Sequence, residues 1–233
     1  MSLSSDWYRA VEQTYVVKYP KQHLATFGTT NIDYYVVTEP LYSALNSQKK
    51  DLEGVVRSGK VKAGQPTLIT PTYAMNLSGF SEDAYQYFDQ VAQMYGPNSP
   101  GIMYQYNNEP ERLEILSGNP DEIAHRISKE LKEKKNDLSV VISGVDEFWD
   151  VALLKFIYEF TASSVSYNSR EMRGAGLMDP QSTAGGIPTA AANQIEEMFR
   201  SVRKGGSPES LKSELDKWGV YRYYEDRFLD LFK

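Results

Sequence analysis

Signals for strands and signals for helices lie in different halves of this chain. Runs of β-branched and aromatic residues, which are typical of strands, occupy residues 32–37, 67–70, 102–106 and 112–116. Residues 54–63 alternate around Ser58-Gly59, as a hairpin would. The separation predicts an α+β fold in which a β-rich N-terminal half, with short antiparallel strands and one or two helices, packs against a mainly helical C-terminal half.

Helix start signals are clearest after residue 116. Asn119-Pro120, Ile187-Pro188 and Ser207-Pro208 each place a proline where a helix can begin. Residues 146–162 are apolar almost all round, which predicts a central buried helix near 146–162. In the first half, helices are predicted near residues 6–15 and over 81–95, the second with Ser81 as its N-cap.

No linker, repeat or low-complexity tract divides the chain. The simplest prediction is therefore a single domain over 1–233. The alternative is a β-rich subdomain over 1–116 and a helical subdomain over 117–233.

Several functional classes are excluded by composition. The 233 residues contain no cysteine, which removes disulfides, thiolate nucleophiles, zinc fingers and thiolate-held iron–sulfur clusters. With two histidines, His23 and His125, one chain cannot build a multi-histidine metal site. The net charge of -6 argues against a nucleic-acid partner. We see no leader and no apolar run of about 18 residues, so we expect a cytoplasmic protein without a membrane partner.

An acidic group at the start of the predicted central helix is a candidate metal site. Asp146 and Asp150 lie one helical turn apart, with Glu147 between them. Such carboxylates could hold a magnesium or manganese ion, although nothing in the sequence requires a cofactor. The alternative is that the acids stabilise the positive end of the helix dipole.

A candidate ligand site lies in the segment 163–186, which reads as a long loop or lid. It contains Asn168, Arg170 and Arg173, and the two arginines, three residues apart on an expected short helix, could together bind a small anionic ligand. The alternative is a connecting segment whose arginines pair with nearby acids. Whether the segment is a lid or a disordered connection stays open at this point.

Two weaker signals involve basic residues. Arg57, Lys60 and Lys62 on the expected hairpin could meet an acidic partner or could protect an exposed strand edge. Gly205-Gly206-Ser207 could cradle an anion before a helix start, or could simply cap that helix.

Aromatic residues suggest association. The chain has 17 tyrosines, and an aromatic cluster near its end exceeds what one helix face can bury. We therefore expect a homo-oligomer with a non-catalytic binding or assembly role, the tail docking against the body or a second subunit. The alternative is an enzyme or sensor for a small anionic metabolite that uses Arg170 and Arg173.

Overall fold

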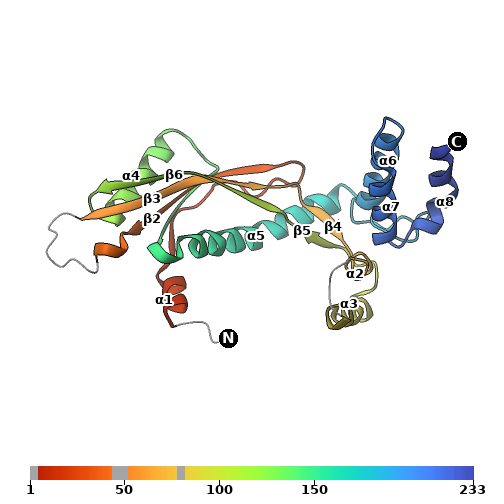
Figure 1. The fold of residues 1–233 in the computed structure, drawn as a ribbon, viewed down its shortest axis with the longest axis horizontal. Helices are drawn as coiled ribbons and strands as arrows, with labels where there is room; N and C mark the ends of the chain where they lie inside the picture. Colours follow the sequence, from red (N-terminus) through yellow and green to blue (C-terminus); the bar gives the residue numbers. More distant parts are fainter. Residues whose placement is uncertain (1–4, 44–51, 78–81) are drawn as a thin grey trace. The chain divides into compact units, whose positions relative to one another are not determined.

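The protein has an α+β fold, as a computed structural model of the chain shows (Figure 1). The structure describes residues 5–43, 52–77 and 82–233. It divides into two compact units, and the boundaries fall after residues 65, 103 and 168. Unit 1 is built from residues 1–65 and 104–168, and unit 2 from residues 66–103 and 169–233. The prediction of a single domain, with its alternative division after residue 116, stays a prediction.

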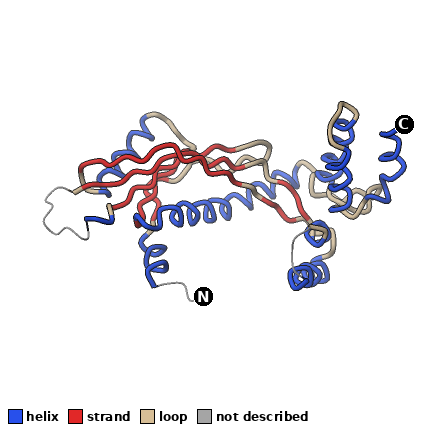
Figure 2. Tube along the Cα trace, viewed as in Figure 1, coloured by secondary structure: helices blue, strands red, loops and turns tan. Residues whose placement is uncertain are grey.

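Unit 1 contains a five-stranded mixed sheet in the order β1-β7-β2-β3-β6 (Figure 2). Its strands are β1 Tyr15–Lys18, β2 Thr30–Glu39, β3 Glu53–Ala63, β6 Tyr106–Ser117 and β7 Ser139–Val145. The central pair β2 and β7 is parallel, and the other neighbours are antiparallel. The end strands are therefore β1 and β6, and they form the two edges of the sheet.

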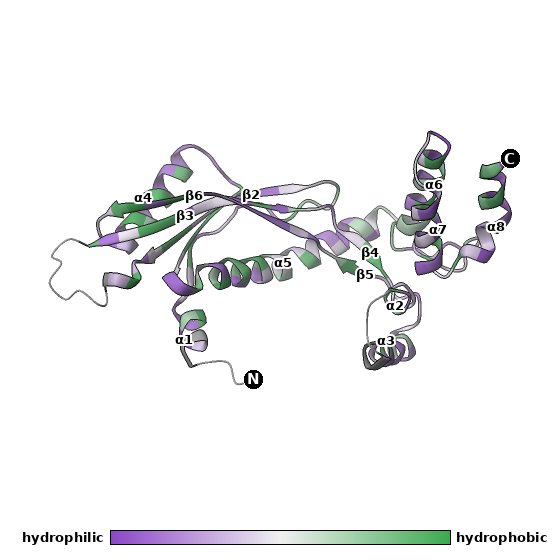
Figure 3. Ribbon diagram, viewed as in Figure 1, coloured by the Kyte–Doolittle hydropathy of each residue, from purple (hydrophilic) through white to green (hydrophobic). Residues whose placement is uncertain are grey.

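Helices cover both faces of this sheet. On one face, Ile32, Tyr34 and Val36 of β2 pack against α5 Trp149–Gly174. On the other face, Val37 packs against α4 Pro120–Glu133. This arrangement follows from the period of two along a strand, which sends alternate side chains to opposite faces. Figure 3 shows that the strands carry both apolar and polar residues.

The remaining elements of unit 1 are short. They are helix α1 Ser5–Gln13, η1 Leu41–Ser43 and η2 Asp146–Phe148. The predicted cap Asn119 of α4 is confirmed, since its side chain accepts a hydrogen bond from Asp121 N at 2.8 Å.

Unit 2 is mainly helical. It contains β4 Thr67–Ile69, β5 Gly101–Met103, α2 Pro71–Met75, α3 Glu82–Tyr95, α6 Thr189–Val202, α7 Pro208–Lys217, α8 Tyr221–Leu229 and η3 Asp230–Phe232. Helices α6, α7 and α8 enclose a core that includes Phe199, Leu215 and Phe228. The predicted N-cap Ser81 of α3 lies outside the described residues.

Much of the C-terminal aromatic cluster belongs to the core of unit 2. Trp218 and Phe228 are buried there, and the Tyr73 ring lies 4.7 Å from the Trp218 ring. Tyr223 and Phe232 are exposed. The aromatic abundance of the tail is therefore explained in large part by packing inside this unit.

The expected hairpin around Ser58-Gly59 is wrong. Strand β3 continues straight through both residues, and the irregularity lies in its pairing with β6 between Ser58 and Gly59. A Cβ atom on Gly59 would lie 2.7 Å from the Tyr34 hydroxyl oxygen and 2.5 Å from the Glu109 carbonyl oxygen. Glycine is needed here for close packing at a bulge, and not for a turn.

The predicted long loop over 163–186 is also wrong for its first half. Helix α5 continues to Gly174, and one buried face runs through Phe160, Ser164, Asn168 and Met172 at intervals of four. Two of these buried positions are polar, so the apolar stripe is interrupted and the helix is hard to recognise from hydropathy. The central helix itself is buried on one face only, since Leu154 and Tyr158 are exposed.

Candidate functional site

The three predicted metal ligands lie at the start of η2 and α5. Asp146 accepts hydrogen bonds at Oδ1 from Thr38 Oγ1 at 2.7 Å and from Arg57 Nη1 at 2.5 Å. Glu147 and Asp150 are exposed, and Asp150 Oδ1 accepts a hydrogen bond from Val151 N at 2.9 Å. Within residues 5–43, 52–77 and 82–233, no three acidic or histidine side chains are grouped so that they could hold a metal ion. The binding of magnesium or manganese by these three acids stays a prediction.

Arg57 has a clear structural partner. Its guanidinium group contacts Asp146, and it also lies 5.6 Å from the centre of the Trp149 ring. Both side chains of the ion pair are about 18% exposed, so the pair is partly shielded from solvent. These contacts tie β3 to the segment that connects β7 with α5.

The predicted ligand residue Asn168 is fully engaged inside unit 1. Its Nδ2 donates to Leu24 O at 2.8 Å and to Thr26 Oγ1 at 2.7 Å, and its Oδ1 accepts from the Tyr104 hydroxyl at 2.8 Å. The side chain is completely buried. Its hydrogen bonds therefore connect α5 to the segment between β1 and β2 and to Tyr104, two residues before β6.

Arg170 and Arg173, in unit 2, are both exposed on the last turns of α5. Neither forms an ion pair with a described acidic residue. The two arginines lie three residues apart on a helix, as the sequence indicates. Binding of a small anion by Arg170 and Arg173 stays a prediction.

The two weaker candidates have structural roles in the described residues. Lys60 pairs with Glu111 at 2.9 Å and Lys62 pairs with Glu109 at 2.8 Å, each across the β3–β6 boundary. The backbone N–H groups of Gly205 and Gly206 donate to Val202 O and Ser201 O at the end of α6. The glycine pair thus satisfies carbonyls of the preceding helix, and these two donors are not available to an anion.

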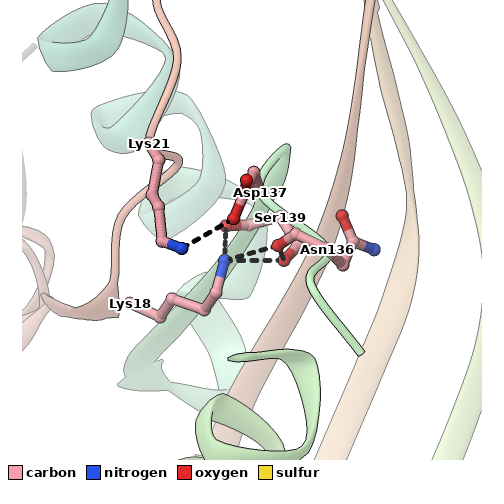
Figure 4. A network of polar contacts seen from close by, with 5 residues as sticks. All are labelled: Lys18, Lys21, Asn136, Asp137 and Ser139. Atoms are coloured by element: carbon pink, nitrogen blue, oxygen red, sulfur yellow. Dashed lines mark hydrogen bonds and ion pairs between the residues drawn. The ribbon is translucent and has the colours of Figure 1, made fainter. Parts of the chain in front are cut away.

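A buried lysine that the sequence analysis did not single out lies on the edge strand β1. Lys18 is 4% exposed, and its Nζ donates to Asn136 O at 3.0 Å, to Ser139 O at 2.8 Å and to Ser139 Oγ at 2.7 Å (Figure 4). All three ammonium protons therefore have acceptors. Burial lowers the pKa of Lys18, and the neighbouring Asp137 carboxylate opposes that shift.

The β1 edge is closed by these contacts. The strand has four residues, its pairing with β7 is irregular between Val16 and Lys18, and its last side chain is a charge pointing inward. Lys155 of α5 donates to Val11 O and Thr14 O at 3.0 and 2.9 Å, which fixes the end of α1 next to the strand. Short length, a bulge and an inward charge are three devices that keep a sheet edge from pairing with another chain.

The β6 edge has a bulge as well, next to Pro110, but beyond it the strand is long and open. The strand has twelve residues, and no described strand pairs with its outer side. Nine of its residues are exposed, among them Leu113 at 60% and Ile115 at 55%. A long edge strand with exposed apolar side chains is a template for pairing with another strand. We therefore take residues 111–117 of β6, which we call the open edge, as the candidate functional site.

Comparison with known proteins does not name this site. The chain matches no protein-family model, no curated protein and no solved structure. In the part of the chain that the structure describes, no helix combines the length and the apolar character needed to cross a bilayer.

Proposed function

We propose that this chain is a non-catalytic assembly protein that associates with itself through the open edge of β6. The observation that carries the proposal is the contrast in exposure between the edges: β6 presents twelve residues with most side chains exposed, whereas β1 is short and closed. Strand addition supplies main-chain hydrogen bonds for affinity, and the side chains on each face supply specificity.

The open edge has the composition that such a contact needs. Leu113 and Ile115 project from the same face of the strand, opposite Arg57 and Val55 of β3. Pairing with another strand would remove part of their apolar surface from water, which favours association. Glu114 projects from the opposite face, opposite Val56, so the two faces of the edge differ in chemistry.

Part of β6 is protected, which limits where a partner strand can pair. Pro110 has no backbone N–H to donate, and the register of β6 against β3 shifts next to it. From Arg112 to Ser117 there is no proline. The proposal therefore places the contact on this part of the strand.

Sedimentation equilibrium of a charged edge variant tests the proposal. We expect wild-type protein to associate at micromolar concentration, and we expect Leu113→Lys with Ile115→Lys to be monomeric because lysines on an edge disfavour strand pairing. The matched control is Leu154→Lys with Tyr158→Lys, since these side chains are also apolar and exposed but lie on α5. A monomeric wild type, or equal association of the edge variant, would refute the proposal.

The anionic-ligand alternative is favoured by one observation, the exposure of Arg170 and Arg173 without acidic partners in the described residues. A thermal-shift screen with organic acids, phosphates, Mg²⁺ and Mn²⁺ tests it, since a ligand at 100 times its Kd stabilises by about 2.7 kcal/mol. A shift seen with wild type and absent from Arg170→Ala with Arg173→Ala would support the clamp. A metal-dependent shift that is lost in Asp150→Asn would support the acidic site.

A further inference from the structure

We infer that Arg112 and Glu114 select both the partner and the register of the open edge, so that β6 pairs antiparallel with β6 of a second copy about a two-fold axis at Leu113. This inference rests on the proposed function. It goes further because it names the residues that decide which contact forms, and because it predicts that assembly stops at a dimer.

Symmetry limits the arrangements to a few registers. A two-fold axis perpendicular to the sheet brings identical edges together antiparallel, and the same patch then serves both subunits. The axis must pass one residue of β6, and that residue faces its own copy across the boundary. The four registers centred nearest the middle of the open edge place Arg112, Leu113, Glu114 or Ile115 on the axis.

Charge separates these registers. With Arg112 or Glu114 at the centre, a like-charged pair lies directly opposite across the boundary, which is destabilising. With Ile115 at the centre, Glu114 faces Leu116 and neither charge gains a partner. With Leu113 at the centre, Arg112 of each copy faces Glu114 of the other, which makes two favourable pairs.

Apolar contacts do not decide between the registers, because the Glu114-centred register would place each Leu113 directly opposite Ile115, but the Leu113-centred register keeps these side chains together as well. Leu113 then faces its own copy, and each Ile115 lies diagonally next to the Leu113 of the other subunit. Directly opposite Cβ atoms are about 4.5–5.5 Å apart and diagonal neighbours about 7–8 Å. The four side chains would lie on a single face of the joined sheet, and the sequence position opposite each Ile115 would be Glu111 of the other copy.

The charged side chains are available for this role. Arg112 and Glu114 are 75% and 54% exposed, and their charged groups lie 4.0 Å apart within the chain, at the limit for an ion pair. An exposed contact of this kind contributes little, so exchanging it for a contact with a second copy costs little.

The fold also explains why the assembly would end at two copies. Once β6 is paired, the remaining edge of each sheet is β1, which is short, bulged and closed by Lys18. Pro110 and the register shift next to it end the new ladder on both sides, because the symmetry repeats them. The joined sheet therefore has no further open edge within the described residues.

Single-cysteine cross-linking tests the register without interference, because the chain has no cysteine of its own. Under mild oxidation, Leu113→Cys should form a disulfide-linked dimer, since only the central residue lies close enough to its own copy. Arg112→Cys, Glu114→Cys and Ile115→Cys should cross-link at least about tenfold more slowly, because they lie beyond the normal Cα separation of a disulfide. Leu154→Cys on α5 controls for random collision.

Charge reversal tests the same inference through affinity. Arg112→Glu and Glu114→Arg should each raise the dimer Kd roughly tenfold, because each makes two like-charged pairs. The double variant should restore the wild-type Kd, and Arg126→Glu, an exposed arginine on α4, should leave it unchanged.

The outcomes separate this inference from the proposed function. Fastest cross-linking at position 112, 114 or 115, or a double variant as weak as the single ones, overturns the register while self-association at β6 stands. Assemblies larger than dimers overturn the closed arrangement. A strictly monomeric wild type overturns the proposed function itself.

Discussion

The two edges of the sheet in unit 1 solve one physical problem in opposite ways. An edge strand carries unpaired backbone donors and acceptors, which attract other strands. Strand β1 has four residues, and it ends at the buried ammonium group of Lys18. Strand β6 has twelve residues, and its apolar side chains Leu113 and Ile115 are exposed. The contrast shows that one edge is protected and the other is exposed, and the proposed self-association rests on this difference.

Removing the buried charge at the closed edge should have the largest effect on stability. Lys18→Met keeps most of the aliphatic chain but removes the ammonium donor to Ser139 O and Ser139 Oγ and one of the two donors to Asn136 O. We expect a loss of about 3 kcal/mol in the free energy of unfolding, measured by urea denaturation. The control Lys21→Met removes an exposed ion pair with Asp137 and should change little. Equal effects for both lysines would show that Lys18 does not close the edge.

A somewhat smaller effect is expected at the connection that follows β1. Asn168→Ala removes three buried hydrogen bonds, to Leu24 O, Thr26 Oγ1 and the Tyr104 hydroxyl. We expect destabilisation of about 2 kcal/mol in urea unfolding, with self-association unchanged. If the variant instead kept full stability and lost an anion-dependent thermal shift, Asn168 would be a ligand residue, as the sequence suggested.

Alkaline pH should weaken the anchor of β6 through Tyr104. Burial raises the pKa of Tyr104 from 10.0 to about 12, with a further contribution from Tyr106. The unfolded chain loses this proton near pH 10 while the folded protein keeps it, so the stabilisation is complete below pH 10 and is lost as the pH rises towards 12. Tyr104→Phe should show a smaller fall of the urea midpoint over this range. The exposed control Tyr158→Phe should behave as wild type, and a Tyr104→Phe curve parallel to wild type would contradict the assignment.

The smallest effect is expected for the exposed ion pairs that flank β6. Lys62→Ala breaks the 2.8 Å contact with Glu109, in which both side chains are largely exposed. We expect less than about 0.5 kcal/mol in urea unfolding and no change in the dimer Kd. A large change in association would mean that the contact extends past the bulge, beyond the open edge.

Local signals allowed much of the helical part to be predicted. Asn119-Pro120 and Ser207-Pro208 open α4 and α7 as expected, because capping depends on neighbours in sequence. The turn predicted at Gly59 is wrong, because glycine is favoured both in turns and where another group packs closely against the backbone. The second reason applies here, since the Tyr34 ring lies against Gly59, and this contact is not visible in the local sequence. The continuation of α5 was missed because Ser164 and Asn168 occupy buried positions where an apolar residue was expected.

The candidate site on β6 could not be predicted from short stretches of sequence. The strand character of residues 112–116 was predicted, but their place at an edge depends on the strand order, which is set by contacts far apart in sequence. For the same reason, nothing around Lys18 signals that its ammonium group reaches Asn136 and Ser139. The predicted acidic and arginine sites drew on spacing alone, and spacing does not show that Asp146 is paired with Arg57.

Amide hydrogen exchange of wild-type protein at low and high concentration tests the central claim most directly, because it reads each edge separately. Between Arg112 and Ile115 every second amide points away from β3, and we expect these outward amides to exchange more slowly as concentration rises, while amides of β1 exchange at constant rates. Protection of β6 that does not depend on concentration, or concentration-dependent protection of β1 instead, would contradict the account.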